Sequence, residues 1–175
     1  MLHNARLLAA AAMVALAGPL PASAADKPSD PEIAHIAYTA GSIDADVARL
    51  ALVKSNNATV REFAQTMLRD HEAVNGKALD LVKKLGVTPQ SNSTSEALAR
   101  QAAATKQRLS GLDGAAFDRA YAENEVAFHR TVNGALKDLL IPSAGNGELK
   151  SLLETGLTLF SEHQLHAEHL ARSLD

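Results

Sequence analysis

Residues 58–85 read ATVREFAQTMLRDHEAVNGKALDLVKKL and carry one of two unbroken heptad patterns in the chain. Side chains at alternating steps of four and three residues share one face, in the order Val60, Ala64, Met67, His71, Val74, Ala78, Leu81 and Leu85. Such a heptad pattern places a continuous, mostly apolar seam along a helix and is typical of helices that pack on other helices. Gly86 ends the helix, and Pro89 prevents it from resuming. The segment therefore predicts one long, packed helix.

Three more long helices follow from the same periodicity. Residues 31–55 follow Asp30, a helix cap, and begin with Pro31 at the first helical position. Residues 148–173 carry a second unbroken heptad seam, and a further helix begins after Gly114 and ends before Pro142. A more hydrophilic helix, from about residue 94 to residue 109, connects the second long helix to the third. The sequence predicts an all-α protein, a four-helix bundle with an additional helical crossover segment between helices two and three.

Composition excludes several classes of site and partner. The chain has 175 residues, a net charge of -3, no cysteine and no tryptophan. Without cysteine there is no disulfide scaffold, thiolate zinc site, iron–sulfur cluster or cysteine nucleophile. A slightly acidic chain with two tyrosines and four phenylalanines also lacks the basic footprint and the stacking platforms of nucleic-acid binders. We expect no nucleic-acid partner.

Residues 1–24 have the features of a signal peptide. Arg6 precedes an apolar stretch over 7–17, and the small residues Ala22-Ser23-Ala24 follow the helix-breaking Pro19 and Pro21. The apolar stretch is well short of the ~20 residues that span a bilayer, so we expect no integral membrane segment after cleavage. This interpretation predicts a periplasmic, exported protein with a polar tail over 25–30 and one helical bundle domain over 31–175.

Polar residues occupy the apolar faces of the predicted long helices at one level. His71 and His163 lie on heptad seams, and Asp44 and Glu125 interrupt the apolar stripes of their helices. All four lie near the midpoints of helices about 40 Å long, at 1.5 Å per residue, so they meet at one depth of the bundle. His129 lies one turn from Glu125, and His166 lies three residues from His163. The predicted ligands of a transition-metal site are Asp44, His71, Glu125, His129, His163 and His166.

Two alternatives to a metal-binding protein remain at this point. Direct pairs, Asp44 with His71 and Glu125 with His163, would close a metal-free polar layer that fixes helix register. The protein would then be an envelope stress or interaction module, with a possible protein partner bound through the 95–110 helix. The other alternative is a redox enzyme. We assign no catalytic residue and favour a binding role.

The sequence also resembles the exported bacterial domain-of-unknown-function family 4142, whose members often carry an outer-membrane label and are placed among ferritin-like folds. The matching segments are ALVKS at 51–55, FAQTM at 63–67 with Asp70-His71, LVKKLGV at 81–87, Tyr121 with ENEV at 123–126 and His129, and HQLHA at 163–167. The resemblance implies a ferritin-like bundle, with five of the predicted ligands on motif positions and Asp44 where the family tends to carry Glu.

The ligand set departs from that of ferritin-like di-iron proteins, which carry Glu three residues before each paired His. Leu68 stands three residues before His71, and His163 stands three residues before His166. Two bridging carboxylates are therefore missing. A site with more imidazoles and fewer carboxylates favours Zn, Cu or Ni over a di-iron centre.

Overall fold

The computed structural model describes residues 27–174, and within this part of the chain every regular element is a helix. The elements are α1 (Asp30–Lys54), α2 (Ala58–Leu85), α3 (Ser93–Ser110), α4 (Gly114–Ala135), the π-helical turn η1 (Leu136–Leu140), α5 (Ile141–Ser143) and α6 (Gly147–Ser173). The predicted all-α class is confirmed. The predicted signal peptide, 1–24, lies outside the described residues. No helix among the described residues is long and apolar enough to cross a membrane.

The bounds of α2 follow from its capping residues. The Asn57 side chain accepts hydrogen bonds from the backbone N–H groups of Thr59 and Val60, which have no partner inside the helix. At the other end Gly86 adopts a left-handed conformation with φ of 64°, which glycine adopts without steric cost. The helix therefore spans the predicted residues.

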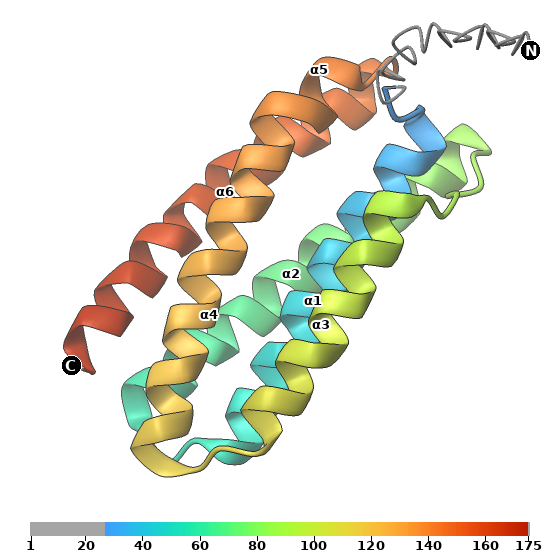
Figure 1. Cartoon of the computed structure of the whole chain (residues 1–175). Coiled ribbons are helices and arrows are strands. Elements are labelled where there is room, and N and C mark those ends of the chain that lie inside the picture. Colours follow the sequence, from blue (N-terminus) through green and yellow to red (C-terminus); the bar gives the residue numbers. More distant parts are fainter. Residues whose placement is uncertain (1–26, 175) are drawn as a thin grey trace, which may run out of the picture.

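The long helices form two antiparallel pairs, α1 with α2 and α4 with α6 (Figure 1). Helix α3 runs back along α1, so α4 starts at the same end as α2 and runs parallel to it (Figure 1). An ion pair of 2.6 Å between Lys54 and Asp113 ties the pairs at one end. At the other end, the Asp30 carboxylate accepts hydrogen bonds of 2.8 Å from the backbone N–H groups of Gly145 and Asn146. Polar contacts thus join the two helical pairs at both ends of the bundle.

The end of α4 differs from the prediction. The helix does not end before Pro142 but continues through η1 and α5 to Ser143. Pro142 has no backbone N–H to donate to the carbonyl of Asp138, and the preceding turn widens into a π-helix. Periodicity over the whole helix does not reveal this local change of register.

The buried apolar residues form two clusters, one toward each end of the helices. The lower core, nearer the α1–α2 connection, includes Val47, Val60, Phe63, Met67, Phe117, Tyr121 and Leu170. The upper core contains Ile33, Ile36, Leu136, Leu140, Leu149, Leu153 and Phe160. Between these clusters lie buried Asp44, His71, Glu125, His129 and His163. The polar layer predicted at mid-helix therefore separates two apolar cores.

Candidate metal centre

Five of the six predicted ligands are brought together. Asp44 comes from α1, His71 from α2, Glu125 and His129 from α4, and His163 from α6. All five side chains are buried, and they form two overlapping groups, each with ligand atoms within 4.8 Å of one another. One group contains the three histidines, and the other contains the two carboxylates with His129. His129 is common to both groups.

The histidine group is compact. The Nε2 atoms of His71 and His129 lie 3.4 Å apart. The ring centroid of His163 lies 5.4 Å from that of each of the other two imidazoles. Three ring nitrogens from three helices therefore face one small volume, which is a ligand arrangement found in metal sites with an open fourth position.

The Asp44 carboxylate borders the same volume. Its Oδ1 lies 3.6 Å from Nε2 of His71, and its Oδ2 lies 3.7 Å from Nε2 of His129. Neither oxygen accepts a hydrogen bond from an N–H group of the described residues, and the polar side chain beside them is the carboxyl group of Glu125. The Oε2 atom of Glu125 lies 3.8 Å from Nδ1 of His129 and is likewise without a partner among these residues. Buried carboxylate oxygens without partners are costly, and a cation among them would lower this cost.

Hydrogen bonds orient two of the three imidazoles. Nδ1 of His129 lies 3.0 Å from the backbone carbonyl oxygen of Glu125, to which we assign it as the donor. Nε2 of His163 lies 3.1 Å from Oδ2 of Asp70 and donates to that carboxylate in the same assignment. These bonds leave Nε2 of His129 and Nδ1 of His163 with free lone pairs. Such bonds on the outer nitrogen fix the tautomer and the ring orientation of metal-binding histidines.

Burial also keeps the imidazoles neutral. It lowers the pKa of His71 to about 3 and the pKa of His129 to about 4. Burial lowers the pKa of His163 as well, although the hydrogen bond to Asp70 opposes this effect. All three rings are consequently neutral near pH 7, and only a neutral imidazole binds a metal.

The two buried carboxyl groups show the opposite shift. Burial first, and the neighbouring Asp44 second, hold the pKa of Glu125 well above its ordinary value. Burial also raises the pKa of Asp44, against the attraction of His129. Both shifts express the cost of carrying negative charge away from water.

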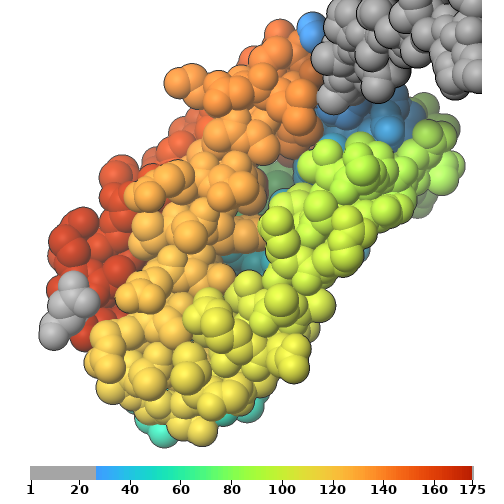
Figure 2. Space-filling model, in the orientation of Figure 1, coloured from blue at the N-terminus to red at the C-terminus, as the bar shows by residue number. Residues whose placement is uncertain are grey.

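A surface hollow leads to these carboxyl groups. A cavity of about 180 Å3 lies between α3 and α4, lined by Gln101 and Thr105 on one side and by Glu125 on the other, with Asp44 behind. Figure 2 shows the hollow between these two helices. An entry path of this kind is a requirement for a buried site that exchanges an ion with solvent.

His166, the sixth predicted ligand, is not in either group. It is exposed and meets the edge of Phe63, with 5.1 Å between the ring centroids. The step of three residues along α6 turns it away from the face that carries His163. His35 and His169, which carry no predicted role, also lie outside both groups.

Two residues of the site were not predicted. Asp70, next to His71 in the chain, contacts His163, and its adjacency to a seam histidine was the available signal. Tyr121 contributes a buried hydroxyl that has no partner within the described residues. Burial raises the pKa of Tyr121, and the nearby Glu125 and Asp44 raise it further, so the phenol stays protonated beside the carboxyl groups.

Antiparallel pairs of long helices around a buried layer of three imidazoles and two carboxyl groups define an all-α protein with a histidine–carboxylate centre. The family model described as Domain of unknown function (DUF4142) matches residues 15–170. The chain therefore belongs to this family, as the sequence motifs predicted. Searches of curated proteins and of solved structures gave no match.

Proposed function

We propose that this is an exported, ferritin-like helical-bundle protein that binds a transition-metal ion in its core and serves in metal handling or in tolerance of metal or oxidative stress. His71, His129, His163 and Asp44 would hold the ion. Glu125 would accept a hydrogen bond or contribute a further ligand from the adjacent group. The bound ion would offset the negative charge of the buried carboxyl groups.

The spacing of the donor atoms carries the proposal. Zinc binds imidazole nitrogen at about 2.0–2.1 Å, so two nitrogens on a tetrahedral ion lie about 3.3–3.4 Å apart. Nε2 of His71 lies 3.4 Å from Nε2 of His129, and the Asp44 oxygens lie 3.6 Å and 3.7 Å from the same two nitrogens. The two imidazole nitrogens thus already have the separation that one ion requires, and each lies beside a different oxygen of Asp44.

The chemistry of the donors favours zinc, copper or nickel over a di-iron centre. Imidazole suits these metals, whereas two iron ions need bridging carboxylates. Leu68 occupies the position three residues before His71, where a di-iron protein carries Glu. Redox catalysis of the di-iron kind is for this reason not part of the proposal.

The ferritin-like assignment and export rest on other observations. A single crossover that makes the second and third long helices parallel is the connectivity of ferritin-like bundles, and α3 provides such a crossover. Export rests on the signal-peptide features of residues 1–24.

Metal analysis of the protein purified without an affinity tag tests the proposal. The protein is stripped with a chelator and dialysed against zinc, copper, nickel or iron(II), and the bound metal is then counted by mass spectrometry. We expect at least one equivalent of zinc, copper or nickel in the wild type and less than a tenth of this, about the level of nonspecific carry-over, in a His71→Ala, His129→Ala double variant. Wild-type protein that retains no stoichiometric metal would refute the proposal.

A metal-free interaction module is the second candidate, and one observation favours it. Helix α3 buries only Ser95 and Leu109, so it is the least buried of the longer helices and could recruit a protein partner. Of the two direct pairs in this alternative, Asp44 lies 3.6 Å from His71, and His163 is hydrogen-bonded to Asp70 and not to Glu125. A melting temperature that neither metal nor chelator changes would favour this second candidate.

A further inference from the structure

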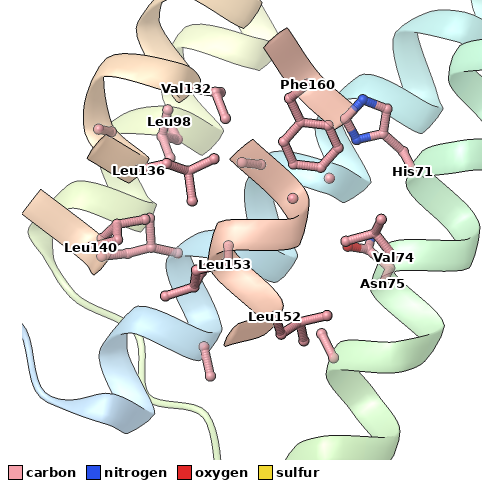
Figure 3. A pocket seen from close by; sticks show the side chains of 18 of the residues that line it. His71, Val74, Asn75, Leu98, Val132, Leu136, Leu140, Leu152, Leu153 and Phe160 are labelled. Carbon is pink, nitrogen blue, oxygen red and sulfur yellow. The ribbon is translucent and has the colours of Figure 1, made fainter. Parts of the chain in front are cut away.

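A second cavity lies above the histidine layer, inside the upper half of the molecule. It has a volume of about 160 Å3 and is lined by residues of α1, α2, α3, α4 with η1, and α6 (Figure 3). Val132, Leu136 and Leu153 line its sides, and His71 and Phe160 lie at one end (Figure 3). We call this cavity the upper chamber.

The seam of α2 shows that the chamber is a packing gap. Val60, Ala64 and Met67 on this seam are fully buried below the histidine layer. Above the layer, Val74 and Ala78 continue the same heptad pattern but are only half-buried. The helix thus presents an apolar face over its whole length, but the protein covers only the lower part completely.

The cavity offers water few partners, because its polar lining residues are limited to His71, Asn75, Thr94, His129 and Thr131. The lining contains no Asp, Glu, Lys or Arg. Asn75, one of its few polar residues, already donates hydrogen bonds to the Tyr38 carbonyl and to Ser42 Oγ. A buried water needs two to four polar partners, and apolar cavities of about 150 Å3 stay dry and take up benzene or xenon.

We infer that the upper chamber is a binding site for a small, uncharged, apolar molecule of about the size of benzene. One wall is already aromatic, because Phe160 stacks on His71 with 4.6 Å between ring centroids and 10° between ring planes. A flat apolar ring fits beside this stack and against the aliphatic side chains. The inference goes beyond the proposed function and does not depend on a bound metal.

Thermal unfolding with benzene as the probe tests the inference, in the presence of a chelator so that metal plays no part. We expect the melting temperature of the full chain to rise and then saturate as benzene is added, since a ligand that binds only the folded state stabilises it. Benzoate, which has the same ring and a charge, should not raise it. A wild-type protein that does not respond to benzene would overturn the inference.

A matched pair of variants on α2 locates the binding. Ala78→Leu places a larger side chain on the chamber lining and should weaken benzene binding by about tenfold or more. Ala73→Leu adds the same side chain at an exposed position of the same helix and should leave binding unchanged. Equal binding by both variants would place the ligand elsewhere.

Methyl spectra of the wild type give a check that needs no variant. Benzene should shift the methyl resonances of Val132 and Leu153, which line the chamber, and leave those of Leu109, in the lower core, in place. Shifts at Leu109 without shifts at Leu153 would contradict the assignment.

Discussion

Asp70 accepts a hydrogen bond from His163 although the two residues lie 93 positions apart, with 3.1 Å between Oδ2 and Nε2. Arg69 donates to the other oxygen of the same carboxylate, at 2.7 Å. Asp70 is therefore held from both sides, and its contact with Nε2 of His163 leaves Nδ1 of the same ring without a hydrogen-bond partner among the described residues. This contact joins the α1–α2 pair to the α4–α6 pair at the level of the site.

The first prediction concerns this contact. Asp70→Asn removes the charge that favours the required tautomer of His163, and we expect metal affinity to fall by about 10–100-fold, as for other outer partners of metal-binding histidines. Competition against a chromogenic chelator measures the affinity. Asp80→Asn, an exposed change on the same helix, is the control. Unchanged affinity in Asp70→Asn would mean that His163 does not bind through the nitrogen assigned to it.

His71→Ala removes a buried ring and should abolish the response of stability to metal. Free metal at 100 times Kd stabilises the wild type by about 2.7 kcal/mol, and the variant should gain none of this. Denaturant unfolding with and without zinc measures both values. The comparison variant is His169→Ala, at an exposed position outside the site, which should respond as the wild type does. Loss of the response in His169→Ala alone would place the site on the outer face of α6.

His166→Ala distinguishes the sequence expectation from the structure. Because His166 is exposed and packs on Phe63, its loss should leave metal stoichiometry and affinity unchanged. Metal analysis and competition titration of this variant measure both quantities. A tenfold or larger loss of affinity, about 1.4 kcal/mol, would show that His166 turns inward when the ion binds.

In the absence of metal, the stability advantage of Glu125→Gln over the wild type should grow as pH rises. The folded-state pKa of Glu125 lies well above the ordinary 4.5, so the folded state retains a proton that the unfolded state has released. The wild type thus loses about 1.4 kcal/mol for each pH unit above 4.5, until the pH passes the raised pKa. Glutamine has no proton to lose, and its advantage should be small at pH 4.5 and grow toward pH 7.

Urea unfolding of both proteins at pH 4.5, 6 and 7 measures this difference. Subtracting the two curves cancels the histidines, which titrate in both. Glu123→Gln, two residues away and exposed, should show no such pH dependence. A stability difference between Glu125→Gln and the wild type that stays constant with pH would mean that Glu125 ionises normally in the folded state.

Helix position and depth were predictable because both depend on local spacing. The heptad seam of α6 identified its buried residues from Leu149 to Leu170, and counting from helix ends put Asp44, His71 and Glu125 at one level. Rise per residue is nearly constant in a helix, so depth follows from the sequence alone.

The neighbours across the bundle were not predictable in the same way. His166 and Asp70 both flank seam histidines, and periodicity does not say which flank meets another helix. That depends on which helix lies on which side, a property of the whole bundle. The packing of α2 beside α6 brings Asp70 to His163. The π-helical turn at Leu136–Leu140 was not predicted for a different reason, because it changes the register within one helix.

The division of the ligands between two helical pairs has a consequence for kinetics. Asp44 and His71 belong to the α1–α2 pair, whereas His129 and His163 belong to the α4–α6 pair. Each pair has short connections and local contacts, which favour its early formation, and the centre is complete only when the two pairs meet. An ion bound there would join the two pairs, and its bonds to one pair would have to break before the pairs could separate. Its main effect would be to lengthen the lifetime of the folded chain by slowing unfolding, while leaving the rate of refolding nearly unchanged.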